Sequence, residues 1–182
     1  MRASEKSDGV GQEGGAAIEA LLTQLHSHDG KVREQARWRL VALRGAAVIP
    51  LADALEDPDW HVRWEAAAAL RDIADPRAAA ALVETLRDRR FGVRWLASDA
   101  LIALRGAALA PLLNTLIHST DSLWLRNGAH HVLRDLSGGH LSREATAILK
   151  PLLAALEGVE PSVEVPLAAR RALDELPKRL GG

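Results

Sequence analysis

The chain has 182 residues, enough for one domain with a substantial core, and its 48% hydrophobic and 26% charged residues are ordinary for a folded globular protein. Its net charge of −1 excludes the overall basicity typical of proteins that bind nucleic acids or anionic membranes. The absence of cysteine excludes disulfides and thiolate metal sites. No stretch approaches the ~20 apolar residues of a membrane span, so we expect no membrane segment and, by default, a cytoplasmic location.

The first fifteen residues, MRASEKSDGVGQEGG, combine four glycines with scattered charges. They lack the apolar segment of a signal peptide. We therefore expect a disordered tail over residues 1–15, followed by a single domain over residues 16–180.

The rest of the chain repeats one pattern of valine, alanine and leucine. Two copies share the sequence V-R-W-x-A-x-x-A-L, beginning at Val62 and Val93. Positions 0, +4, +7, +8 and +11 lie on one helical face, so each copy predicts an amphipathic helix of about fourteen residues. Five copies begin 30, 31, 32 and 40 residues apart, at Val32, Val62, Val93, Leu125 and Val165.

Another helix, marked by two leucines four residues apart, precedes each of these segments. Asp29 and Asp59 lie three residues before the valine, where we expect them to cap the second helix. Gly45 and Gly106 are expected to end the long helices of the first and third repeats as C′ glycines. The repeats are predicted at approximately residues 16–45, 46–75, 76–106, 107–138 and 145–177.

The fifth repeat departs from the pattern in two respects. The link from Ser137 to Thr146 is about eight residues longer than its counterparts, which predicts either a functional loop or a simple insertion. The fifth segment has Pro166 in place of arginine and is rich in charge near its end. We interpret it as a cap, because the terminal repeat of a stack needs a polar outer face.

The helices with V-R-x-x-A-x-x-A-L, the Asp57-Pro58-Asp59 turn and the Pro-Leu of the preceding helix resemble the HEAT repeat, specifically the short type named for the phycobilisome lyases. The resemblance covers roughly residues 16–177. It implies an all-α, right-handed α-solenoid of about five helical hairpins, in which the second helices line the concave face. Such repeats serve many roles, so the resemblance implies no single function.

On the second helices, positions +2, +6 and +9 point away from the apolar stripe. Three tryptophans are among them, and tryptophan is a frequent hot-spot residue of interfaces. The alternative is that these rings pack on neighbouring helices, the role we expect for Trp60 and Trp124 in the turns. The predicted partner-binding residues are Trp38, Trp64, Arg71, Trp95, Asp99, Asn127, His131 and Arg134.

An arginine follows the valine position in four repeats. A structural ladder with aspartates of the turns is favoured over an anion-binding row, because arginine suits bidentate pairing. The predicted members are Arg33, Arg63, Arg94, Arg126, Asp29, Asp59 and Asp88.

We expect a non-catalytic protein–protein interaction scaffold, with no catalytic residue and no cofactor. A bilin lyase-like subunit that handles a tetrapyrrole is the alternative implied by the resemblance. Trp95, Asp99 and Arg134 also resemble the site of HEAT-like alkylpurine DNA glycosylases, but residues 46–138 carry a net charge of −2, whereas DNA binding needs a positive surface. No histidine pair has the i, i+4 spacing of a metal site, so no metal is predicted.

Overall fold

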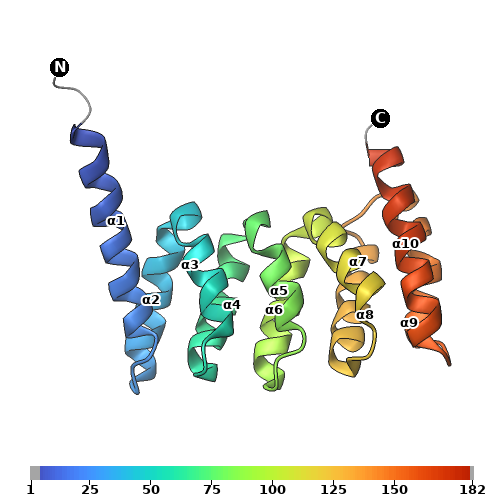
Figure 1. Cartoon of the computed structure of the whole chain (residues 1–182), viewed down its shortest axis with the longest axis horizontal. Coiled ribbons are helices and arrows are strands. Elements are labelled where there is room, and N and C mark those ends of the chain that lie inside the picture. Colours follow the sequence, from blue (N-terminus) through green and yellow to red (C-terminus); the bar gives the residue numbers. More distant parts are fainter. Residues whose placement is uncertain (1–4, 181–182) are drawn as a thin grey trace.

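The computed structural model describes residues 5–180, and the side chains of residues 14–176. Ten α-helices and four short 3-10 helices, with no β-strand, make up this part of the chain. They stack side by side along the long axis of the molecule (Figure 1). The prediction of an all-α solenoid of about five hairpins is confirmed. Within the described range, no helix is both long enough and apolar enough to cross a membrane.

The helices alternate with short turns throughout the chain. In order, they are α1 (Glu5–Gln24), α2 (Gly30–Ala42), η1 (Arg44–Ala46), α3 (Val48–Asp53), η2 (Ala54–Glu56), α4 (Trp60–Ile73), η3 (Pro76–Ala78), α5 (Ala79–Thr85), α6 (Phe91–Ala103), η4 (Arg105–Ala108), α7 (Leu109–His118), α8 (Leu123–Ser137), α9 (Arg143–Glu157) and α10 (Pro161–Leu180). Helices α2, α4, α6 and α8 pack against one another in sequence, and so do α3, α5 and α7. The two rows form the two layers of the solenoid.

The core lies between the two layers and is made by the predicted stripe. Its members in the second to fourth repeats are at most 1% exposed, and burying such side chains supplies most of the stability of a repeat stack. They are Val62, Ala66, Leu70, Val93, Ala97, Leu101, Leu125, Ala129 and Leu133.

Short polar side chains cap the N-termini of α2, α4 and α8, whereas α6 has no side-chain cap. The carboxylate of Asp29 accepts a hydrogen bond from the backbone N–H of Lys31, and that of Asp59 accepts one from His61. Both N-cap predictions are confirmed. The bond to the His61 N–H is also the main reason why the pKa of Asp59 is lowered.

The C-terminal ends of the second helices differ from the prediction. The residue in the left-handed region is Arg44 after α2 (φ 47°) and Arg105 after α6 (φ 54°), so the prediction of Gly45 and Gly106 in that role is wrong. Each glycine instead follows the left-handed residue, within a 3-10 turn. Glycine at position 45 leaves room for the Arg77 side chain, whose Nη2 donates a hydrogen bond to the Gly45 carbonyl. A Cβ at this position would lie only 2.9 Å from that nitrogen.

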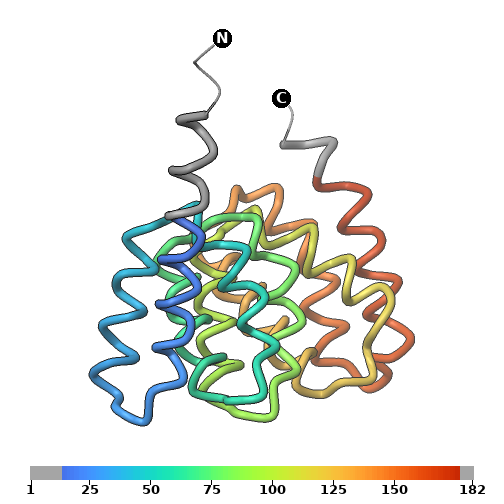
Figure 2. The backbone as a smooth tube through the Cα atoms, turned by 60° about the vertical axis from the view of Figure 1, so that its left-hand side comes forward, coloured from blue at the N-terminus to red at the C-terminus, as the bar shows by residue number. Residues whose placement is uncertain are grey.

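The fifth hairpin is joined to the stack with its two layers exchanged. The 3-10 helices η1, η3 and η4 follow α2, α4 and α6, and each leads the chain from the second-helix layer to the first. The link 138–142 has no such turn, so α9 runs back beside α8 while α10 packs against α7. The α7 and α10 helices lie side by side in Figure 2 (yellow and red). Consequently α10, the segment with the Val165 pattern, does not continue the row of second helices as the sequence pattern predicted.

Half of the predicted long link, Ser137 to Thr146, is helical. Helix α9 begins at Arg143, so only residues 138–142 are outside a helix. Pro151 therefore lies inside α9, whereas Pro50 and Pro111 each lie in the first turn of their helices, where proline is well tolerated.

The predicted tail over residues 1–15 overlaps α1, which begins at Glu5. Residues 1–4 lie outside the described residues. The division into tail and domain stays a prediction.

Replacing Ala74 by glycine should stabilise the protein by up to about 1 kcal/mol. Ala74 is exposed and ends α4 with φ 53°, a conformation that costs a residue with a Cβ about 1 kcal/mol. Ala42→Gly is the matched control at the last helical residue of α2, where glycine should lower stability by about 0.5–1 kcal/mol. Urea unfolding of the three proteins measures both changes, and a loss of stability in Ala74→Gly would contradict the assignment.

Candidate partner-binding site

A hollow lined by aromatic side chains lies between α6 and α8. It has a volume of about 300 Å³. We call it the aromatic pocket, and its lining residues are Phe91, Arg94, Trp95, Ser98, Trp124, Asn127, Gly128 and His131. Three of the predicted partner-binding residues, Trp95, Asn127 and His131, are thus brought together here.

The rings of the aromatic pocket contact one another and remain open to solvent. Trp95 stacks on His131, with ring centroids 5.1 Å apart and planes 27° apart, and the centroid of Phe91 is 6.2 Å from that of Trp95. Phe91 is 69% exposed, Trp95 48% and Trp124 44%. Large apolar rings left this open are expensive to hydrate, which makes them available for an apolar ligand group.

Arg94 supplies the positive charge of the pocket. Its guanidinium carbon lies 4.7 Å from the Trp124 ring centroid and 5.8 Å from that of Phe91, distances that allow cation–π attraction. Its Nη1 donates a 2.7 Å hydrogen bond to the carbonyl of Asp88, so the turn before α6 fixes the orientation of the side chain. The pocket therefore offers apolar ring faces beside a positioned cation.

Gly128 allows α8 to approach the pocket floor. A Cβ at this position would lie 3.0 Å from Leu86 Cδ2, and Leu86 is fully buried at the end of α5. A side chain here would require Leu86 or α8 to shift by a few tenths of an ångström.

Trp64 lies between the core of α4 and the start of α6. It is half-buried against the core, and its ring lies over Gly92 at the start of α6, 3.6 Å from where a Cβ would be. Because Gly92 is next to Phe91 in the chain, Trp64 connects the core of α4 to the edge of the aromatic pocket.

Trp38 and Arg71 lie apart from the aromatic pocket, beside a charged cluster between α2 and α4. Trp38 is 52% exposed under the guanidinium of Arg37, 4.5 Å from its ring centroid. Arg71 binds Asp72 Oδ1 through Nε and Nη2 at 3.0 and 2.9 Å. Neither Trp38 nor Arg71 lines the aromatic pocket.

The charged cluster is centred on the buried pair of Arg37 and Glu65. Arg37 Nε donates to Glu65 Oε2 at 2.9 Å, and Nη1 donates to Asp72 Oδ2 at 3.4 Å. Burial raises the pKa of Glu65, and the Arg37 and Arg33 charges oppose this effect. The pair ties the first repeat to the second.

The four arginines of the predicted ladder share a different bond. In each, Nη1 donates a hydrogen bond to the backbone carbonyl oxygen of the residue six positions earlier. The donors Arg33, Arg63, Arg94 and Arg126 bind the carbonyls of Ser27, Asp57, Asp88 and Thr120, respectively. A bidentate pair with a turn aspartate is formed by Arg63, whose Nε and Nη2 bind the two Asp88 oxygens at 2.6 and 3.2 Å. Asp29 and Asp59 serve as N-caps, and the ladder holds mainly the turns of single repeats.

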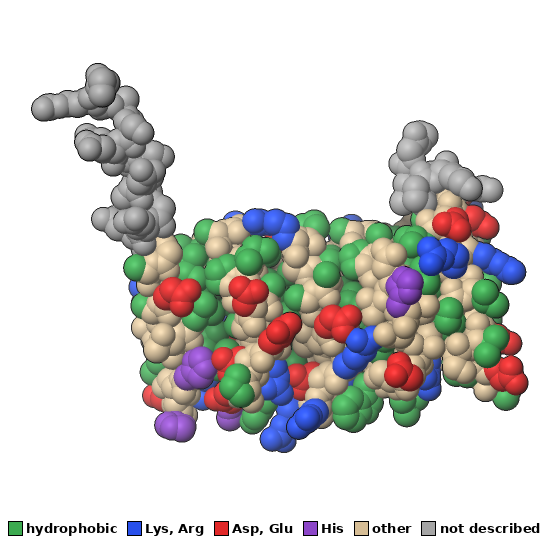
Figure 3. Space-filling view, in the orientation of Figure 1, with side chains coloured by type: hydrophobic (Ala, Val, Ile, Leu, Met, Phe, Trp, Pro, Cys, Tyr) green, Lys and Arg blue, Asp and Glu red, His purple; other side chains and the backbone are tan. Residues whose placement is uncertain are grey.

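Asp99 and Arg134, the other two predicted binding residues, do not line the aromatic pocket. Asp99 is half-buried and Arg134 is exposed. Among the described residues, no three His, Asp or Glu side chains lie close enough together to hold a metal ion. On the face seen in Figure 3, acidic and basic side chains are interspersed and do not form a positive surface.

Sequence reasoning missed five of the eight lining residues of the pocket, among them its cation and two of its aromatic rings. Trp124 was expected to pack over a turn, Arg94 was placed in the ladder, and Phe91 was not considered. A usable signal was present, because Phe91 lies four residues before Trp95 and Trp124 lies seven before His131, so each pair shares a helical face.

Comparison with known proteins gives one family. The family model of HEAT repeats matches residues 18–102 and 50–134, together well over half of the chain. A search of curated proteins finds no match.

Similar solved structures are repeat or engineered proteins. One engineered protein is 24% identical, with 85% of this chain and 77% of that chain covered and a TM-score of 0.48. A second is also 24% identical, with coverages of 88% and 47% and a TM-score of 0.44. A designed armadillo repeat protein is 20% identical, with coverages of 86% and 98% and a TM-score of 0.40.

Glu65→Gln should lower the free energy of unfolding by about 2–4 kcal/mol, because it leaves the buried Arg37 charge without its main partner. Replacing Arg37 and Glu65 together by methionine removes both charges and should cost much less than the single change. Chemical denaturation of the three proteins measures the difference. A double replacement as costly as the single one would show that the ion pair itself contributes the stability.

Gly128→Ala should destabilise the protein by about 1 kcal/mol, since overpacking against the buried Leu86 outweighs the gain in helix propensity. Gly92→Ala is the control within the neighbouring helix, because its Cβ would make only an ordinary 3.6 Å contact with Trp64. Its urea midpoint should stay unchanged or rise slightly. Equal midpoints for the two variants would mean that α8 is free to move away from Leu86.

Proposed function

Because the chain belongs to the HEAT repeat family, whose model matches residues 18–102 and 50–134, we propose that it is a non-catalytic scaffold that binds a segment of a partner protein. The observation that carries the proposal is the aromatic pocket between α6 and α8. The finer resemblance to the phycobilisome-lyase type stays a prediction.

The pocket supports protein binding because of what it exposes. A hollow of about 300 Å³ is of a size to take one side chain of a partner, and its walls are the half-exposed rings of Trp95 and Trp124. Tryptophans of this kind, surrounded by polar residues, dominate the binding energy of many interfaces. Asn127 and His131 supply polar groups beside the rings, which can fix the orientation of a bound segment.

The charge of the pocket selects the kind of segment. Arg94 lies between the two exposed rings of Phe91 and Trp124. A segment with an aromatic or aliphatic side chain next to a carboxylate satisfies both features, since the side chain covers the rings and the carboxylate approaches the guanidinium. We therefore assign the partner an apolar residue flanked by Asp or Glu.

The remaining predicted binding residues form two extensions of this site. Trp64, at the pocket edge, is a platform over which the segment leaves α6 towards α4. Trp38 and Arg71 lie beside the first and second repeats and make a second, separate contact. Asp99 and Arg134 lie on α6 and α8, the two helices of the pocket, outside its lining, and contribute charge to the surface that the bound segment crosses.

Replacing Trp95 and Trp124 together by alanine should abolish capture of the partner. Loss of two hot-spot tryptophans weakens an interface by at least about 2 kcal/mol, which corresponds to about 30-fold in affinity. Affinity purification from the source cells, with quantitative mass spectrometry of the bound proteins, measures the loss. The probe for direct binding is then a peptide from the protein that is lost, titrated into both chains.

Trp60→Ala is the matched control, because Trp60 is an exposed tryptophan at the start of α4 outside the aromatic pocket. It should leave capture unchanged. Far-UV circular dichroism confirms that both variants are folded. A folded Trp95→Ala, Trp124→Ala protein that captures the same partner at wild-type level would rule out this site.

A further inference from the structure

Arg94 lines the aromatic pocket without a carboxylate to balance its charge. The lining of the pocket contains no Asp or Glu. The Nη1 group of Arg94 donates to the Asp88 carbonyl, and none of the ion pairs in the described part of the chain includes this arginine. Its Nε and Nη2 groups are therefore without a carboxylate partner.

The equivalent arginines of the first two repeats obtain a carboxylate from the next repeat. Arg33 Nε lies 3.8 Å from Glu65 Oε1, and Arg63 binds both oxygens of Asp88 through Nε and Nη2 at 2.6 and 3.2 Å. Glu65 lies three residues after the valine position of its repeat, and Asp88 lies five residues before the valine position of the repeat that follows Arg63. These are the two positions from which a neighbouring repeat supplies a carboxylate to such an arginine.

Both positions are uncharged in the repeat that follows Arg94. They are occupied by Thr120 and Gly128. The Thr120 carbonyl accepts a hydrogen bond from Arg126 Nη1, as the Asp88 carbonyl does from Arg94, so Thr120 and Asp88 hold equivalent places in their turns. The chain thus provides the donor side of an arginine–carboxylate pair at Arg94 and has no acid at either position that could accept from it.

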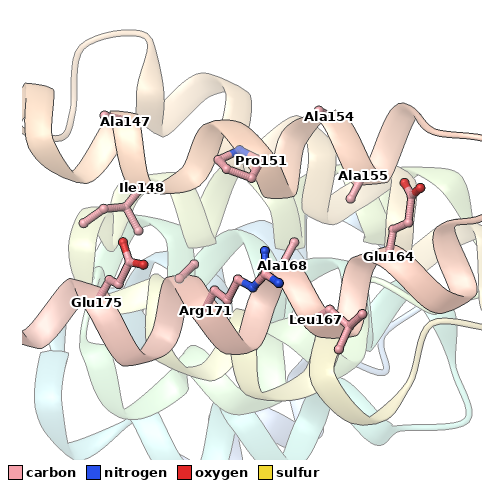
Figure 4. A pocket seen from close by; sticks show the side chains of 11 residues that line it. Ala147, Ile148, Pro151, Ala154, Ala155, Glu164, Leu167, Ala168, Arg171 and Glu175 are labelled. Atoms are coloured by element: carbon pink, nitrogen blue, oxygen red, sulfur yellow. The ribbon is translucent and has the colours of Figure 1, made fainter.

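Other arginines without an ion pair are in different surroundings. Arg171 lines a groove of about 610 Å³ between α9 and α10, and Glu164 and Glu175 of the same helix line that groove as well (Figure 4). Its charge is therefore balanced by carboxylates within the groove. Arg126 does not line the aromatic pocket. The aromatic pocket combines a cation with apolar rings and no acid, so a ligand that carries a carboxylate balances its charge.

We propose that Arg94 binds an Asp or Glu side chain of the partner segment through Nε and Nη2, in the bidentate arrangement by which Arg63 binds Asp88. This rests on the proposed function, in which the aromatic pocket takes an apolar side chain of the same segment. The guanidinium is already oriented, because the Asp88 carbonyl binds Nη1 and the Trp124 ring centroid lies 4.7 Å from the guanidinium carbon. A fixed arginine fork loses little entropy when it forms charge-assisted bidentate bonds.

The shape of the pocket sets the spacing between the two binding residues of the partner. A hollow of about 300 Å³ holds one side chain, whereas a bound helix uses several anchors along a groove, so the segment is extended. Adjacent side chains of an extended segment point to opposite sides, and those two positions apart lie on the same side, about 7 Å from each other. The guanidinium carbon of Arg94 is 5.8 Å from the Phe91 ring centroid, which matches this separation. The flanking acid is therefore the second residue from the apolar one.

Thr120→Asp tests the assignment, because it supplies the carboxylate from within the chain. Its side chain should bind Nε and Nη2 of Arg94 and so compete with the partner. The probe is the peptide GSFGDSG with both ends blocked, titrated into the isotope-labelled protein, and two-dimensional NMR follows the indole N–H signals of Trp95 and Trp124. Thr120→Asp should weaken binding at least about tenfold. Thr120→Asn is the control of nearly the same size without the charge, and it should bind the peptide as the wild type does.

Two further peptides test the acid and its spacing. GSFGNSG has a neutral amide in place of the carboxylate, and GSFDGSG has the acid next to the phenylalanine. Both should bind the wild type at least about fivefold more weakly than GSFGDSG, since neither places a carboxylate at Arg94. Arg94→Gln should bind GSFGDSG and GSFGNSG equally, because the side chain that distinguishes them has been removed.

The role of Arg94 is overturned if Thr120→Asp binds GSFGDSG as tightly as Thr120→Asn does, or if either of the other peptides binds the wild type as tightly as GSFGDSG. It is also overturned if the wild type binds none of the peptides at about 5 mM. Capture of the partner from cells separates this result from a failure of the proposed function. If the Trp95→Ala, Trp124→Ala protein loses capture and Thr120→Asp retains it, the scaffold function stands and the role of Arg94 does not.

Discussion

Close packing of small side chains between neighbouring second helices is the contact on which the rest of the structure depends. Helices α4 and α6 pack against each other, and about half of the residues that they bury are alanine or serine, small side chains that let helices approach closely. Bulky rings do not fit in this layer, so they are displaced to its outer edge, where Trp64 and Trp95 lie. The short spacing between helices then lets rings on α6 and α8 meet in one hollow. The main residues in this layer are Ala66, Ala67, Ala68, Ala69, Ala97, Ser98 and Ala100.

The repeat spacing was sufficient to predict the solenoid, its core stripe and the Asp29 and Asp59 caps, because each depends on local periodicity. The repeat spacing did not predict that Arg44 and Arg105 adopt the left-handed conformation, because the glycine that follows each of them is the stronger sequence signal for it. The pocket was predicted in part. Trp95 was found from its helical face, but Trp124 was discounted because a position beside a turn does not reveal which neighbouring helix it meets.

The exchange of layers at the fifth hairpin breaks the translational symmetry of the stack. Up to α8, each hairpin repeats the preceding one along a single axis. A duplicated hairpin such as α5–α6 would therefore pack against the same kinds of helices on both sides. Beyond α8 this relation ends, because α9 and α10 present their layers in the opposite order. A duplicated hairpin inserted before α8 therefore keeps the contacts of the array, whereas one inserted after α8 meets the two layers in exchanged order.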